Sequence, residues 1–450
     1  MTAATAEAAL EAFIAAATRQ DIPALLAALL PEALPQLGAL NLGGIGVLQR
    51  HELLERHERG GDTVLGVRLH ADEVVDLEVV WRETGGGWKV AGASRLQQAA
   101  PGGVGVMEQA AGNIGADLRW LDPGTEWGVR APLGAHGLTL DAINVGSYGA
   151  VPAHGAHATQ RPRGAAVNAD TPGMGISIFE QAEVWSPIAA SLYEEAIQRR
   201  WSPATEIPWA EITALEPDLE AAICQLCTAI SERQLLAADV PAGWEHRISY
   251  DFHEVKLFLA TQIFDAARHA EAFRKRALAN GGGLGRQSPG NVARLIVDAQ
   301  VFSEMSLLLH VLVSAQTALW LRIGAACAPG LAEYRLFALA QQDLARHLAY
   351  GLSHLRFLLE REPGRAAELH RYLDKGEGMI ASDLERDAAL GDALAILLGR
   401  GRDGAQAGRR RLAALGERWI SEYLGRLQWA GLDGREARLD ARLRAALTAA

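Results

Sequence analysis

Apolar residues recur at helical spacing through most of the chain after residue 178. The pattern predicts one helix over 180–200 and then four long helices, over 217–241, 251–280, 288–327 and 331–362, with shorter helices after them. Pro217 suits the first position of a helix, and Asp251 with Glu254 forms a capping-box pattern. Because long helices joined by short connections favour antiparallel packing, this part of the chain is predicted to be a helical bundle.

The first hundred residues follow a different pattern. Helical composition over 6–17 and 22–30 gives way to β-branched stretches over 63–70 and 74–81, a turn at Gly85–Gly87 and a further strand from Trp88. Residues 101–178 are rich in Gly, Ala and Pro, which favours a covering segment or a linker. The predicted fold class is mainly α: a small α+β domain over 1–100, the segment 101–178, and a bundle with extra C-terminal helices over 179–450.

Composition narrows the classes of partner. The chain has 450 residues and a net charge of −11, which argues against general affinity for nucleic acid or an anionic membrane. Its apolar runs are broken by polar residues before they reach membrane-spanning length. The first residues lack the basic start of a signal peptide, and three cysteines do not suggest a disulfide framework. We expect a cytoplasmic protein with no nucleic-acid or membrane partner.

A pentapeptide occurs twice in the predicted bundle. Residues 265–269 read DAARH and residues 343–347 read DLARH, so that both fit D-x-A-R-H. Each Asp lies one turn before its His on the same helix face. Two helices of one bundle therefore present the same Asp, Arg and His side chains, which indicates a common origin.

The repeat resembles the D-E-x-R-H motif of ferritin-like di-iron proteins, in which two helices each supply a Glu-x-x-His pair. The stretches YEEAIQRRW…EIPW, FLATQIFDAARHAEAF and AQQDLARHLAYG are also similar to the ribonucleotide reductase small subunit and arylamine N-oxygenase group, over about 185–360. The resemblance implies a ferritin-like bundle in which Asp265 and Asp343 are hydrogen-bond partners of ligating histidines. The family's Glu positions are occupied here by Ala266 and Leu344.

The first hundred residues carry a second resemblance. A helical start followed by a meander ending in VVWRETGGGWKVAG is similar to the cone-shaped fold of SnoaL-like and nuclear-transport-factor-like domains. Many such domains bind small ligands and many only dimerise, so the resemblance implies a possible small-molecule ligand or a homodimer without implying an activity.

With both Glu positions apolar, the four long helices still carry other side chains that could bind a metal. The lone carboxylate is predicted to be Glu232, with His269 and His347 from the repeat and His310 (or Ser314) on the third helix. Ala and Leu can neither ligate nor neutralise two dications, and poorly compensated charge in a helix core is unfavourable. One carboxylate with two or three histidines suits a single Fe, Zn or Cu ion better than a bridged pair.

Three hypotheses follow. The leading one is a degenerate member of the di-iron oxidase lineage that serves as a binding or assembly scaffold without ordinary di-iron oxygen activation. The alternative is an oxidoreductase with a non-standard His-rich metal centre. The third is a small-molecule carrier that uses the N-terminal domain.

Overall fold

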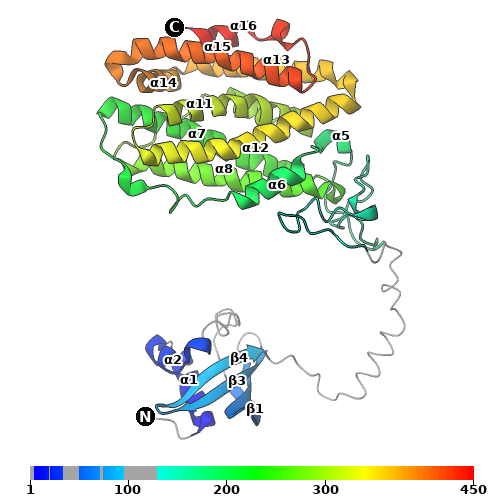
Figure 1. Ribbon diagram of the computed structural model, residues 1–450, viewed down its shortest axis with the longest axis vertical. Helices are drawn as coiled ribbons and strands as arrows, with labels where there is room; N and C mark the ends of the chain where they lie inside the picture. The colour runs from blue at the N-terminus through cyan, green and yellow to red at the C-terminus, as the bar shows by residue number, and fades with distance from the viewer. Residues whose placement is uncertain (1–4, 20, 34–49, 71–73, 96–128, 450) are drawn as a thin grey trace. The chain divides into compact units, whose positions relative to one another are not determined.

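The computed structural model describes residues 5–19, 21–33, 50–70, 74–95 and 129–449. The chain forms two compact units, Met1–Asp122 and Pro123–Ala450, which are described separately here (Figure 1).

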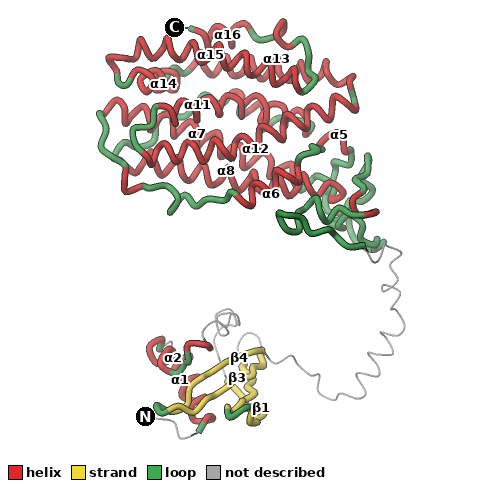
Figure 2. The backbone as a smooth tube through the Cα atoms, in the orientation of Figure 1, coloured by secondary structure: helices red, strands yellow, loops and turns green. Residues whose placement is uncertain are grey.

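The first unit is a four-stranded antiparallel meander with helices (Figure 2). Its elements are α1 (Ala6–Thr18), α2 (Ile22–Ala27), β1 (Arg50–Arg59), β2 (Asp62–His70), β3 (Val74–Thr84) and β4 (Gly87–Arg95). Leu10 of α1 and Leu65, Leu77 and Trp81 of the sheet are buried in one core. The predicted helices and the strands β2, β3 and β4 are confirmed, whereas β1 was not predicted because its sequence, RHELLERHER, is mostly charged and exposed.

The second unit is helical. Figure 1 shows α7, α8, α11 and α12 running side by side, with α13 to α16 in a further layer beside them. Its longer helices are α6 (Ala189–Gln198), α7 (Pro217–Glu245), α8 (His253–Ala279), α11 (Ser314–Ala326), α12 (Leu331–Arg361), α13 (Ala366–Arg386), α14 (Ala389–Gly399), α15 (Ala405–Trp429) and α16 (Ala441–Thr448). The predicted fold class, mainly α with a helical bundle and a small α+β unit, is confirmed.

The third long helix differs from the prediction, which was one helix over 288–327. The chain instead forms α9 (Asn291–Val297), breaks, and continues as α10 (Phe302–Ser306), a π-helix (Leu307–Val313) and α11. At the break, the Glu304 carboxylate accepts a hydrogen bond from the Gln300 backbone N–H at 3.0 Å, which satisfies a donor at the start of α10. A local side-chain interaction therefore ends one helix and begins another inside an unbroken apolar pattern.

The predicted capping box at Asp251 and Glu254 is wrong. Asp251 accepts from the Ala156 N–H at 3.0 Å, and Glu254 accepts from Arg163 Nη1 at 2.9 Å and from Asn144 Nδ2 at 2.8 Å. The Arg163 and Glu254 side chains are almost completely buried. These contacts hold the described part of 101–178 against the start of α8, so both acids serve tertiary contacts rather than the helix end.

One stretch of helix, Phe302–Ala326, is long and apolar enough to cross a membrane by length and composition, among the described residues. Most of it is buried inside the bundle, and a core helix passes the same test.

Candidate functional site

The two copies of the repeat meet in the middle of the bundle. Asp265 and Arg268 lie on α8, and Asp343 and Arg346 lie on α12. Arg268 Nη2 donates across the bundle to Asp343 Oδ2 at 2.7 Å, and Arg346 Nη2 donates across to Asp265 Oδ2 at 2.8 Å. Each guanidinium also donates to the Asp of its own helix. Two carboxylates and two guanidiniums thus form a closed, pairwise symmetric network in the core.

The histidines of the repeat extend this network. His269 Nε2 donates to Asp343 Oδ2 at 2.9 Å, and His347 Nε2 donates to Asp265 Oδ2 at 3.4 Å. Their ring centroids are 6.5 Å apart, and both rings are buried. The pairing across the bundle that the repeat predicts is present, while a role of these residues beside a metal stays a prediction.

Trp201, from the segment before α7, closes one side of the network. Its indole Nε1 donates to Asp343 Oδ2 at 2.7 Å, and the Arg268 guanidinium lies 4.6 Å from the ring centroid. Asp343 therefore accepts hydrogen bonds from three residues on two helices and from one loop residue. Such convergence fixes the relative positions of α8 and α12.

The two aspartates and two arginines of the network balance each other in charge. Burial alone would raise the pKa of Asp343, but the hydrogen bond from His269 and the charges of His269, Arg346 and Arg268 outweigh it and hold that pKa well below its usual range. Burial lowers the pKa of His347, against the opposing hydrogen bond with Asp265. Two ionised carboxylates and two guanidiniums sum to zero, so the core carries balanced charge.

The residues in the core do not fit the metal centre of the resemblance. Ala266 and Leu344, both buried, fill the positions of the two Glu ligands. Both ring nitrogens of His269 are engaged, because Nδ1 is hydrogen-bonded to the Gln234 amide at 3.1 Å and Nε2 to Asp343. Within the described ranges, no group of three or more His, Cys, Asp or Glu side chains is arranged to hold a metal ion.

His310 is also completely buried in the bundle and lies on the π-helix. Gln262 Nε2 donates to His310 Nε2 at 2.8 Å, and His310 Nδ1 donates to Ser306 Oγ at 2.9 Å. Burial lowers the pKa of His310 well below its usual value, so its ring is neutral. The π-helix approaches α12 so closely that a Cβ added at Gly351 would lie 2.5 Å from His310 Cβ. Ser314 donates back to the Leu309 carbonyl and offers no free hydroxyl proton.

Glu232 does not join the histidines, contrary to its predicted place in the ligand set. Its carboxylate accepts from the Ser288 backbone N–H at 3.1 Å and from the Ser288 hydroxyl at 2.5 Å, on the face of α7 that meets the segment after α8. The α7 residue that reaches His269 is Gln234.

Residues that sequence reasoning left without a role complete the core. Gln234 gave no signal in the sequence, and Trp201 appeared only as the last residue of the YEEAIQRRW stretch, without an assigned role. Arg268 and Arg346 did give a signal, because the Arg recurs in both copies of D-x-A-R-H and sits one residue before each His. Each copy of the repeat contains one Asp and one Arg, so counting charges in the repeat would have predicted that the two copies neutralise each other.

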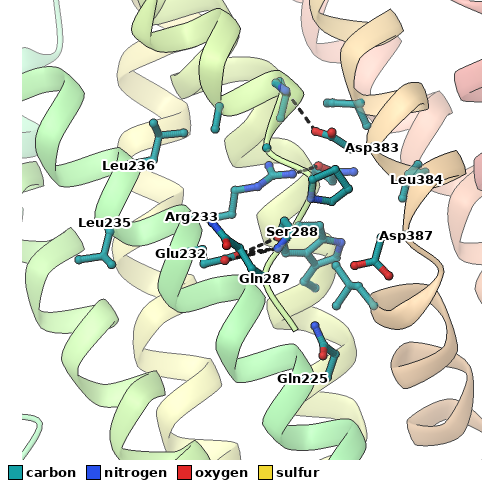
Figure 3. Close-up of a pocket in the computed structure, with 18 residues that line it drawn as sticks. Gln225, Glu232, Arg233, Leu235, Leu236, Gln287, Ser288, Asp383, Leu384 and Asp387 are labelled. Atoms are coloured by element: carbon teal, nitrogen blue, oxygen red, sulfur yellow. Dashed lines mark hydrogen bonds between the residues drawn. The ribbon is translucent and has the colours of Figure 1, made fainter. Parts of the chain in front are cut away.

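A pocket lies on the outside of α7, where Glu232 was found. Its volume is about 290 Å³, and it is bounded by α7, residues 287–290, α9, α11, α13 and the start of α14 (Figure 3). Figure 3 shows Arg233 extending from α7 toward the Ser288 segment, with Asp383 and Asp387 on the opposite side. The pocket and the buried network are separate features of the bundle.

The chain matches no protein-family model and no curated protein. The solved structures similar to it include R2-like ligand-binding oxidases. A single-residue variant with an aerobically reconstituted Mn/Fe cofactor is 18% identical, over 54% of this chain and 93% of that chain, with a TM-score of 0.38. A second variant, with an aerobically reconstituted Fe/Fe cofactor, is 19% identical over 54% and 92% of the two chains, with a TM-score of 0.38. Similarity at this level gives no basis for assigning their cofactors or activity to this chain.

Proposed function

We propose that this protein is a binding scaffold built on a ferritin-like bundle, and that it does not activate oxygen at a di-iron centre. One observation carries the proposal: the two positions that would supply the Glu ligands are the buried apolar side chains Ala266 and Leu344. The neighbouring aspartates are already paired with Arg268 and Arg346, each of which bridges both of them. In a buried site, charges that are already paired and hydrogen-bonded have little to gain from a dication.

The donor set supports the same conclusion. A metal ligand must offer a lone pair, and His269 and His310 each use both ring nitrogens in hydrogen bonds. Binding a metal there would require these bonds to break and the buried partners, Gln234 and Gln262, to go unsatisfied. Leaving buried polar groups without partners costs about 1–3 kcal/mol each.

Metal content tests the proposal directly. Purified protein is incubated with ferrous iron without oxygen, desalted and analysed for iron, zinc and copper. We expect well under two irons per chain and no absorption of an oxo-bridged pair. Two tightly held irons per chain would overturn the proposal. One equivalent of a single metal that is lost in His269→Ala would replace it with the alternative, an oxidoreductase with a His-rich centre.

A second measurement uses the double variant Ala266→Glu, Leu344→Glu. New carboxyl groups in this apolar, balanced core should lower the stability of the protein in chelator, because buried charge without a partner is unfavourable. Recovery on adding ferrous iron would indicate that both positions still face a common site. The small-molecule carrier role of the N-terminal domain, a homodimer and a cytoplasmic location stay predictions.

A further inference from the structure

The pocket on the outside of α7 contains a buried hydrogen-bond donor with no partner. Arg233 Nη2 donates to Gln316 Oε1 at 3.0 Å, whereas Arg233 Nη1 is buried and has no hydrogen-bond partner among the described residues. The guanidinium lies 4.7 Å from the centroid of the Trp320 ring. Burial lowers the pKa of Arg233 to about 10, against the opposing charges of Asp383 and Glu232, so the group is still charged at neutral pH. An unsatisfied buried donor is costly, and an acceptor from a ligand would remove that cost.

The acidic residues of the pocket do not supply the acceptor. Asp383 accepts from the backbone N–H groups of Asn291 and Val292 at 2.9 and 3.1 Å, at the start of α9. Glu232 is bonded to Ser288, and Asp387 accepts from the Ala389 N–H at 2.8 Å, at the start of α14. Each carboxylate therefore holds the frame of the pocket together.

Much of the remaining wall is apolar, and the amide side chains of Gln225, Gln287 and Gln316 also line it. The pocket is lined by Leu235, Leu236, Val292, Ala293, Trp320, Ile380, Leu384 and Leu390. A ligand with an apolar, flat body would bury surface against these side chains, and its polar end would meet Arg233. A mostly apolar cavity with a few oriented polar groups is the usual form of a small-molecule site.

The charge of the lining decides between classes of ligand. Glu232, Asp383 and Asp387 line the pocket together with a single cation, Arg233. A carboxylate or phosphate would be attracted by Arg233 but repelled by the three acids. An ammonium would be attracted by the acids, but it has no lone pair with which to accept a hydrogen bond from Arg233 Nη1. A neutral carbonyl oxygen accepts from Arg233 without either disadvantage.

We propose that this pocket binds a small, uncharged organic molecule with an aromatic or alicyclic body and a carbonyl oxygen, which accepts a hydrogen bond from Arg233 Nη1. The site goes beyond the proposed function: it assigns a ligand class, and it uses no residue of the buried Asp–Arg–His network. If no ligand bound in this pocket, the metal measurements proposed above would be unaffected. If the protein bound two irons, the test of this pocket would likewise be unaffected.

The test compares three probes that share a naphthalene body and differ in their polar group: a neutral amide, an anionic carboxylate and a cationic amine. Naphthalene-2-carboxamide, naphthalene-2-carboxylate and 2-naphthylmethylamine are titrated into the full chain, and binding is measured by ligand-observed NMR and calorimetry. We expect the amide to bind most tightly. Tighter binding of the carboxylate or the amine would overturn the neutral-ligand proposal, and so would the absence of amide binding at millimolar concentration.

Two variants locate the binding. Arg233→Met removes the donor but keeps an apolar stem, and it should weaken amide binding by about tenfold or more, the usual weight of a charge-assisted hydrogen bond. Leu390→Trp fills the pocket from α14 and should abolish binding while leaving Arg233 intact. The matched controls are Arg335→Met and Leu278→Trp, at exposed positions outside the pocket, which should bind as the parent does. Unchanged binding in both pocket variants would overturn the assignment.

Discussion

Removing one charge from the buried network is the most direct perturbation of the bundle core. Asp343 is completely buried, and its carboxylate accepts hydrogen bonds from Trp201, Arg268, His269 and Arg346. Asp343→Asn keeps the shape of the side chain but leaves two guanidiniums with a single carboxylate. Because an uncompensated charge then remains buried, we expect the free energy of unfolding to fall by about 3–5 kcal/mol.

A second substitution separates charge balance from the loss of hydrogen bonds. Arg346→Met removes one guanidinium and keeps most of its stem, so the double variant Asp343→Asn, Arg346→Met returns to one acid and one base. Its loss of stability should be smaller than the sum of the two single losses, by a coupling energy of about 0.5–3 kcal/mol. Asp298→Asn, which breaks an exposed ion pair with Arg294, is the matched control and should cost less than about 1 kcal/mol.

Urea unfolding followed by far-ultraviolet circular dichroism measures these losses, because most of the described helix belongs to the bundle. The slopes of the five transitions, those of the parent and the four variants, must agree for the comparison to hold. The reasoning would be refuted if Asp343→Asn cost no more than the surface control, or if the two single losses were simply additive.

Three further outcomes are expected. Stability should fall as the pH drops from about 6.5, because burial lowers the pKa of His310 and His347 in the folded state below that in the unfolded chain. It should fall again below about pH 4, because the pKa values of Asp265 and Asp343 are depressed in the folded state and the carboxylates become protonated. Urea midpoints measured across pH report both steps. Gly351→Ala should lose about 1–3 kcal/mol in the same urea assay, because its Cβ would clash with the π-helix, whereas Gly364→Ala, with open space around it, should change little. Arg163→Met should leave Glu254 buried without its partner and increase hydrogen exchange within 129–178; unchanged exchange there would contradict the anchoring role.

The sequence predicted the elements whose hydrophobic period is regular. The α7, α8 and α12 helices lie close to their expected ranges, and the strands rich in β-branched residues are present. β1 could not be read from its sequence, because a charged, exposed edge strand has little hydrophobic alternation. At the break over 298–301 the Gln300 N–H donates to Glu304, and the π-helix packs closely against Gly351; neither contact can be read from the apolar pattern.

The candidate site was predicted only in part, because the repeat fixed the orientation of two helices and nothing fixed that of α7. The spacing inside D-x-A-R-H fixes which face each Asp and His shares, so the pairs across the bundle followed from the repeat. The residue of α7 that faces the histidines did not follow from the sequence, because no motif on α7 showed which side of that helix faces the core. Glu232 and Gln234 are two residues apart, which is about 200° around a helix, so they lie on nearly opposite faces. The prediction chose the acidic residue, and the structure has the amide facing His269.

The composition of the repeat explains how the bundle can lack the two Glu ligands and still keep a polar core. The Glu positions of the resemblance, 266 and 344, are apolar and add no charge, while every ionised group that remains belongs to an Asp–Arg pair. Since each Arg bridges both aspartates, neither helix can shift along the other without breaking hydrogen bonds to both. The same residues that would orient histidines around a metal therefore also fix the register of α8 and α12. On this argument, conservation of Asp, Arg and His in such a chain reports on bundle geometry, and only the residues at 266 and 344 report on metal chemistry.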